Sequence, residues 1–374
     1  MKTNDIPKWK TVGQRVASAR KALGWPQAVL ADKLGLDRTA VTKIESGDRG
    51  VDTLELSIIA EFLGRPMDWF VRGEADAIVS RRDSGVANSV LDEDHRVDRV
   101  ATDVKVVVDM GHLRIRRPAR KRFRLQSLAD AERMAEAARG FIAVSGPLRD
   151  MTGAVESLGL LAFSLDLGEQ AAVGAYVSLE SVGVALVNGK LPTGRRRFAL
   201  AHELGHHLLL DGYDSYSDVS IGRVEREQLI DAFAAHVLLP RASVARRWRE
   251  LTKSGEDVRG ASVHVVTEYG VSWSALVNHL RNLDLVGEAE RERLVVEKPT
   301  KREFLERGLT LWEDLAPPKV PKSYVVSVMA AYCKNKISAR RAVEMLYGTI
   351  DMADLPEPDQ IPLEAFSSDR EPSE

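Results

Sequence analysis

Residues 194–210 have the sequence GRRRFALAHELGHHLLL, and this stretch decides how the surrounding chain is interpreted. Its apolar residues recur with a helical period, so we expect a helix that ends at Asp211-Gly212. At about 100° per residue, His202 and His206 lie about 40° apart on one face, so both imidazoles can bind one ion. Glu203 projects about 100° away from His202 and lies beside the ion, where a base can act on a water molecule.

The third ligand of such a site has to come from another element, because catalytic zinc takes three protein ligands and keeps one position open. The next helical pattern, residues 224–239, carries Glu227 and, four residues later on the same face, Asp231. We assign Glu227 as the third ligand; Glu225 is close to it in sequence but lies on a different face of the helix. We assign Asp231 as the carboxylate that accepts the second N–H of a ligand histidine, His202 before His206. This set suits Zn²⁺, and another divalent metal is the alternative.

The alternative interpretation, without a metal, is a helix with two solvated or core histidines. The apolar helix, the strand patterns before it and the acidic pair after it all favour the metal site. His207 faces about 140° away from His202, so we expect it to pack rather than to bind the ion. A structural role is also expected for His236, which lies about 180° from Glu227 on its helix. No oxyanion-stabilising residue is assigned, and Arg195–Arg197, Tyr213 and Tyr216 are interpreted as surface or packing residues.

Segments with the period of strands precede the motif, at 160–165, 173–179 and 182–187. Helical patterns cover 128–138 and 148–158 before them. A small sheet followed by two helices indicates an α+β domain, which we place at residues 125–260.

The flanks of this domain are less informative. We interpret residues 73–124 as a linker, although the valine-rich part from Val100 to Val108 can also form a strand. The Arg and Lys residues of 114–124 are interpreted as a solvated strip, with a second phosphate-contacting strip as the alternative. Residues 261–350 predict a helical accessory region that shapes substrate access or dimerises. Residues 351–374 predict a flexible acidic tail.

Composition restricts the classes of function. The chain has 374 residues, a formal net charge of −2 and one cysteine, Cys333. The length suits two or three domains, and the charge carries no overall signature for nucleic acid. A single cysteine excludes an intrachain disulfide and a thiolate metal cluster, and it fits a reducing, cytoplasmic setting. Signal-peptide and membrane-spanning patterns are absent, so we expect no membrane partner and a substrate inside the cell.

Two stretches together resemble the ImmA/IrrE family of metallopeptidases. They are LVNGKLPTGRRRFALAHELGHHLLL at 186–210 and EREQLIDAFAAHVLLP at 225–240, and the resemblance covers about residues 125 to 285. Leu229-Ile230 departs from the Glu-Ala pair frequent in relatives, which leaves the ligand set intact. The resemblance implies a zincin-like fold and a zinc endopeptidase. It also implies that the substrate is a transcriptional repressor, whose cleavage switches on stress or mobile-element genes.

The segment PQAVLADKLGLDRTAVTKIESG at 26–47 resembles the helix-turn-helix of Cro/repressor-type (XRE) regulators. It lies within residues 8–72, where four or five short amphipathic helices predict an all-α domain. Residues 38–45 are the expected recognition helix, with Asp37 as its N-cap. Its exposed positions are expected to meet base edges or phosphates: Arg38, Thr39, Thr42 and Lys43. Gln27 is expected to contact a phosphate or to brace this helix.

Double-stranded DNA is therefore a predicted partner, and a second copy of the chain is a further candidate. Residues 1–72 hold twelve Lys and Arg against nine Asp and Glu, a balance of +3, so the field is only mildly basic. Such modules also serve as protein-interaction domains. The expected architecture is multidomain, with the helix-turn-helix domain, the α+β domain and the helical C-terminal region in that order.

Three functions remain open at this point. The first is a zinc peptidase with a DNA-binding head, the second a DNA-binding regulator whose metal domain senses, and the third a scaffold with a degenerate site. Glu203 favours catalysis over sensing, since a sensor needs no base.

Overall fold

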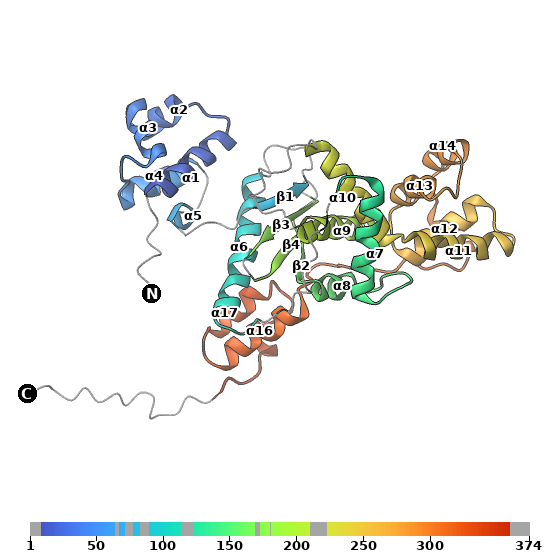
Figure 1. Ribbon diagram of the computed structural model, residues 1–374. Coiled ribbons are helices and arrows are strands. Elements are labelled where there is room, and N and C mark those ends of the chain that lie inside the picture. The colour runs from blue at the N-terminus through green and yellow to red at the C-terminus, as the bar shows by residue number, and fades with distance from the viewer. Residues whose placement is uncertain are drawn as a thin grey trace, which may run out of the picture. The chain divides into compact units, whose positions relative to one another are not determined.

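The structure of the protein is a computed structural model (Figure 1). The structure describes these residues: 9–63, 67–71, 78–82, 90–113, 115, 123, 125–168, 173–179, 181–209 and 223–359. The contacts divide the chain into two compact units. The first consists of Met1–Ala77 and Ala87–Arg96, and the second of Ile78–Val86 and Val97–Glu374.

The first unit contains a bundle of short helices, as the sequence predicted. The helices are α1 (Trp9–Ala22), α2 (Gln27–Leu34), α3 (Arg38–Ser46), α4 (Thr53–Phe62) and α5 (Met67–Val71). Asp37 caps α3 by accepting a hydrogen bond from the amide of Ala40, and Asp52 caps α4 through Glu55. Val16, Leu30 and Ile44 belong to one buried apolar cluster. This cluster fixes the angle between α2 and the predicted recognition helix α3.

The second unit is built on one four-stranded mixed sheet. Its strands are β1 (Ile78–Arg82), β2 (Leu160–Leu165), β3 (Gly174–Ser178) and β4 (Gly183–Asn188), in the order β1-β3-β4-β2. β2 and β4 are parallel, whereas β3 pairs antiparallel with both β4 and β1. The three strands predicted from sequence are confirmed, with bounds within about one residue of those expected. β1 was not predicted.

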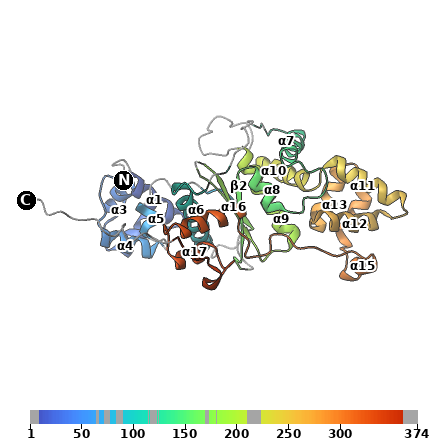
Figure 2. The same cartoon turned by 90° about the horizontal axis from the view of Figure 1, so that it is seen from below.

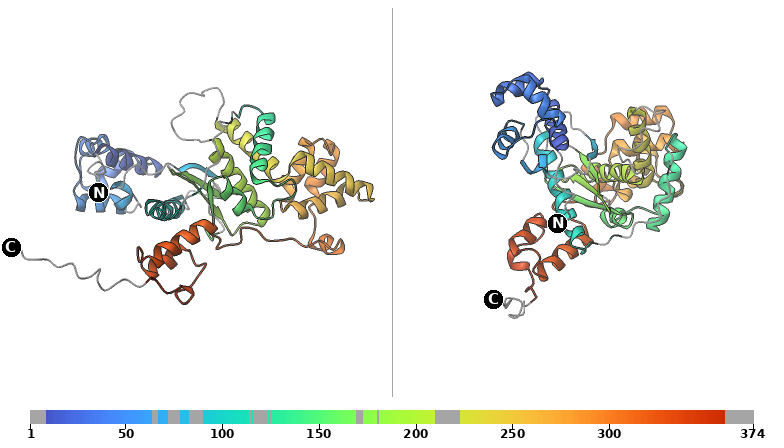
Figure 3. Two further views of the ribbon diagram at one scale, coloured as in Figure 1. Left: turned by 60° about the horizontal axis from the view of Figure 1, so that its bottom comes forward. Right: turned by 60° about the vertical axis from the view of Figure 1, so that its left-hand side comes forward.

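Helices cover both faces of the sheet (Figures 2 and 3). Leu160 and Ala162 of β2 point into a core shared with α7 (Leu128–Ile142), α8 (Met151–Ser157), α9 (Thr193–Leu209) and α10 (Arg223–Leu238). The alternate residues Leu161 and Phe163 point into a second core with α6 (Val90–Asp109), α16 (Lys322–Cys333) and α17 (Ala339–Met345). This alternation follows from the two-residue period of a strand. The multidomain α and α+β architecture is therefore confirmed.

The segment from Val100 to Val108 is a helix, so the strand alternative was wrong. It forms part of α6, on which Val97, Val100, Val104 and Val107 are all buried. Their spacing of three and four residues is a helical stripe, and packing on the sheet overrides the β propensity of valine. Residues 73–124 also contain β1, so they are not a linker throughout. Most of the basic strip at 114–124 lies outside the described residues.

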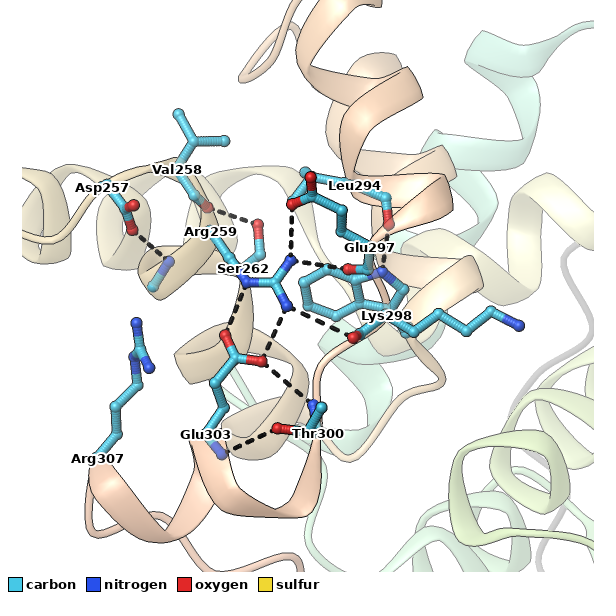
Figure 4. Close-up of polar contacts among 12 residues, drawn as sticks. Asp257, Val258, Arg259, Ser262, Leu294, Glu297, Lys298, Thr300, Glu303 and Arg307 are labelled. Atoms are coloured by element: carbon cyan, nitrogen blue, oxygen red, sulfur yellow. Dashed lines mark hydrogen bonds and ion pairs between the residues drawn. The ribbon is translucent and has the colours of Figure 1, made fainter.

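The C-terminal helices pack onto the same unit and do not form a separate one. They are α11 (Arg241–Lys253), α12 (Val258–Tyr269), α13 (Trp273–Asn282), α14 (Glu288–Val296) and α15 (Lys301–Glu306) before α16 and α17, with the short 3-10 turn Met352–Asp354 after them. Arg259 of α12 ties α14 to α15. It donates to Glu303 at 2.7 Å and to the carbonyl of Glu297 at 2.8 Å (Figure 4). Among the described helices, none combines the length and apolar character needed to cross a membrane.

Candidate metal centre

The HELGH run lies on α9, and the described surroundings of this helix bury it on nearly every side. His202, Glu203 and His206 are at most 3% exposed. Gly205 permits the close approach of α10, because a Cβ at this position would lie 2.8 Å from Cγ2 of Ile230. Glycine is therefore required here by packing. The approach brings Glu227 and Asp231 of α10 against the two histidines.

Three potential ligand atoms meet at this contact. Nε2 of His202 lies 3.2 Å from Nε2 of His206, and Oε2 of Glu227 lies 3.1 Å and 3.6 Å from these two nitrogens. Ligand atoms about 2.0–2.1 Å from a tetrahedral zinc ion are about 3.3 Å apart, so this triangle matches one face of the tetrahedron. Within the described parts of the chain, this is the one group of three suitable side chains so arranged. The donor set and its spacing therefore fit zinc.

Asp231 orients one of the histidines. Its Oδ1 lies 2.8 Å from Nδ1 of His202, so Nδ1 carries the proton and the lone pair of Nε2 faces the ligand triangle. Burial by itself lowers the pKa of His202, but hydrogen bonds to Asp231 and Glu227 raise it overall. Hydrogen bonds from His202 and His206 hold the pKa of Glu227 well below its ordinary value. Glu227 is therefore ionised, as a metal ligand must be.

Glu203 lies beside the triangle and is completely buried. Its carboxylate approaches the first residue of β3: a Cβ added to Gly174 would lie 3.1 Å from Oε1 of Glu203. Sequence reasoning missed Gly174. The available signal was a glycine at the start of a strand, a position that often marks a close approach of another group.

The remaining histidines near the motif have packing partners. Nδ1 of His207 lies 3.1 Å from the hydroxyl of Tyr176, while its Nε2 lies 3.1 Å from the carbonyl of Leu158. His236 stacks edge to face on His279, with 4.5 Å between ring centroids. Neither belongs to the ligand triangle.

The basic run before the motif divides into exposed and buried residues. Arg195 is exposed, whereas Arg196 and Arg197 are buried. Arg197 forms an ion pair with Asp314, 117 residues later in the chain. The two tyrosines considered from sequence, Tyr213 and Tyr216, lie outside the described residues.

In the first unit, the residues expected to contact DNA separate into two kinds. Arg38, Thr39, Thr42 and Lys43 lie exposed on α3. Gln27 is instead half-buried and joins α2 to α3. Its amide nitrogen donates to Oε2 of Glu45 at 2.9 Å, and its amide oxygen accepts from the hydroxyl of Thr42 at 3.2 Å. These contacts brace the predicted recognition helix, which is one of the two roles considered for Gln27.

A second brace was not foreseen from sequence. Nε of Arg20 on α1 pairs with Glu45 at 2.6 Å, and both side chains are nearly buried. Glu45 therefore holds α1, α2 and α3 together, because it accepts from Arg20 and from Gln27.

Comparison with known families finds two matching segments. Residues 16–70 match the helix-turn-helix family, and residues 155–281 match the IrrE N-terminal-like domain, a peptidase family. The chain therefore carries an ImmA/IrrE-like domain after an N-terminal helix-turn-helix domain. No curated protein matches the chain.

The matched ranges contain the predicted DNA-contacting residues of the first unit and the predicted metal-site residues of the second. The ImmA/IrrE-type segment includes β2, β3, β4, α9 and α10, and thus the whole ligand triangle. The IrrE-like match implies a metal, usually zinc, and together with the helix-turn-helix match it supports a DNA-binding, protease-like protein. The match begins at residue 155, whereas the resemblance covers about residues 125 to 285, so α7 lies outside the match.

Proposed function

We propose that the chain is a zinc-dependent endopeptidase with a DNA-binding head, and that its substrate is a helix-turn-helix repressor. Cleavage of that repressor would switch on stress or mobile-element genes. The observation that carries the proposal is the ligand triangle of His202, His206 and Glu227, with Glu203 next to it and Asp231 behind it. Double-stranded DNA is the partner proposed for the exposed positions of α3.

The chemistry divides between the ion and the side chains. Zinc, when bound, polarises the scissile carbonyl and lowers the pKa of the attacking water. Glu203 accepts a proton from that water as its oxygen attacks the carbonyl carbon. The same carboxyl group then gives the proton to the nitrogen as the C–N bond breaks, so the products are a carboxylate and an amine. Asp231 keeps His202 in the tautomer whose Nε2 can bind.

The competing function is a DNA-binding regulator whose zinc domain senses without cutting. The buried position of Glu203 favours cleavage, because a carboxylate that neither binds metal nor reacts is costly to bury. A sensor requires the ligands alone.

Zinc content and cleavage test the proposal together. The purified chain is expected to hold about one zinc per molecule, and a co-expressed helix-turn-helix repressor is expected to be cut. Glu203→Gln should lower the cleavage rate by at least about 10²-fold while zinc content stays the same. Glu225→Gln, the same change at an exposed position of α10, is the matched control and should cut normally. Bound zinc without cleavage of any neighbouring repressor would support the regulator instead.

A further inference from the structure

β3 passes close to the proposed base. α9 contacts it, and Gly174, its first residue, faces Glu203 and the side chain of Ala199. A Cβ on Gly174 would be 3.1 Å from Oε1 of Glu203 and 3.6 Å from Cβ of Ala199. The backbone of β3 therefore passes directly beside the group that acts on the peptide bond.

One edge of β3 pairs with β4, and the other edge pairs with β1. The second pairing is antiparallel, with Arg82 opposite Gly174, Arg81 opposite Ala175 and Ser80 opposite Tyr176. α9 also contacts β1. The backbone of Arg82 is thus directly across from the residue that faces Glu203. Among the strands that the structure describes, β1 alone pairs with this edge.

A sheet edge binds extended polypeptide through main-chain hydrogen bonds, largely independent of its sequence. The edge of β3 is suited to hold a substrate in this way, because a strand along it passes beside Glu203. That edge is already taken by a segment of the same chain, which precedes α6 and follows the helix-turn-helix domain in sequence.

We propose that β1 is a resident strand on the substrate-binding edge of β3, and that a protein substrate binds as an extended strand by displacing Ile78–Arg82. This displacement rests on the proposed peptidase function and describes how a protein substrate enters the site. The chain thereby competes with its own substrate. The expected consequence is low activity until β1 leaves the edge.

The strand is of a kind that exchanges readily. β1 has five residues, lies at the border of the sheet, and its pairing is irregular between Ile78 and Ser80. Short, bulged edge strands are held by few main-chain bonds and open locally before the rest of a fold. An incoming strand restores the bonds that β1 gives up, so the exchange is nearly balanced.

Proline tests the pairing, because it has no N–H to donate. In an antiparallel pair, one of two neighbouring residues donates to the partner strand, so Ser80→Pro with Arg81→Pro removes that bond whatever the register. Ser80→Ala with Arg81→Ala keeps both N–H groups and is the matched control. Replacement of Ile78–Arg82 by a Gly/Ser segment of equal length is the second variant.

Two readouts on the full-length, zinc-loaded chain decide the proposal. A tripeptide hydroxamate, which combines a zinc-binding group with an extended backbone, should bind at least about tenfold more tightly to the proline and Gly/Ser variants than to the alanine control. Acetohydroxamate lacks the backbone and should bind all forms equally. Amide hydrogen exchange in β3 should be faster in the proline and Gly/Ser variants, and binding of the tripeptide hydroxamate should slow it again.

Equal affinity of the tripeptide hydroxamate for all forms would overturn the proposal, and so would unchanged exchange in β3. Failure of the peptidase function has a different signature: no form would then cut a co-expressed repressor, while the hydroxamate affinities and the exchange in β3 would still report on β1. Either variant is sufficient for the test if the other does not fold.

Discussion

The ion pair between Arg197 and Asp314 leads to the most discriminating prediction about the fold. Arg197 lies on α9, five residues before His202, and its side chain is 0% exposed, while that of Asp314 is 8% exposed. Burial lowers the pKa of the Arg197 guanidinium, and the charge of Asp314 opposes this effect. Arg197 also donates to the carbonyl of Leu148 at 2.8 Å and lies 4.7 Å from the ring of Trp312. The cation is therefore enclosed by protein and depends on one carboxylate.

Asp314→Asn removes the charge and keeps the shape. Loss of one partner of a buried ion pair costs about 3–5 kcal/mol, because the other charge remains buried without compensation. For a unit of this size, each kcal/mol lowers the melting temperature by about 2–4 °C, so we expect a fall of about 6–20 °C. When the variant is heated, bound zinc should be released over the same lowered temperature range as unfolding, because α9 carries two of the proposed ligands.

The neighbouring residue supplies a matched control. Glu313 pairs with Arg196 one position away on α9, but its side chain is 71% exposed. Exposed pairs contribute about 0–1 kcal/mol, so Glu313→Gln should lower the melting temperature by less than about 4 °C. Differential scanning calorimetry on the full-length variants measures both. Similar shifts for the two variants would refute the argument that burial makes the Arg197 pair decisive.

Three further predictions concern the metal, acid stability and DNA. Asp231→Asn should weaken zinc binding about 10–100-fold by releasing the ring of His202, as measured by competition with a chelating indicator; unchanged affinity would contradict this role. Burial lowers the pKa of His279 to about 3 from an ordinary 6.5. Between about pH 3 and pH 6.5 the unfolded chain therefore binds more protons than the folded chain, so the free energy of unfolding decreases as the pH drops below about 6.5. At pH 5 the free energy of unfolding is lower by roughly 2 kcal/mol. His279→Gln should therefore reduce the fall in melting temperature between pH 7.5 and 5. Arg38→Ala and Lys43→Ala should each reduce, by about one unit, the slope of the logarithm of the DNA-binding constant against the logarithm of the salt concentration. Fluorescence anisotropy with duplex DNA measures this slope, and an unchanged slope would exclude phosphate contacts.

Much of the ligand triangle could be predicted because its spacing is local. The period of a helix places His202 and His206 on one face, and the same rule places Glu227 and Asp231 together on the next helix. What the rule does not provide is the contact between the two helices. That contact depends on Gly205, where a side chain would collide with Ile230.

Other features depend on residues far apart in sequence. The partner of Arg197 is 117 positions away, and Glu45 joins Arg20 across 25 positions. No periodic pattern marks such pairs, because each half alone resembles an ordinary surface charge. The valines of α6 misled for a related reason. Their intrinsic preference is for strands, and the sheet that they cover as a helix is assembled from later residues.

The C-terminal segment, interpreted from sequence as an accessory region, holds the first half of α9 in place. Arg196 and Arg197 anchor α9 to Glu313 and Asp314, and the far end is held by His207 against Tyr176. The proposed ligands lie between these two anchors. Ligand atoms that must meet within a few tenths of an ångström need support of this kind, because a helix fixed at one end alone leaves the other end free to rotate. The triangle is therefore maintained by residues that lie outside it, and loss of Asp314 should lower the temperature at which the proposed metal is released.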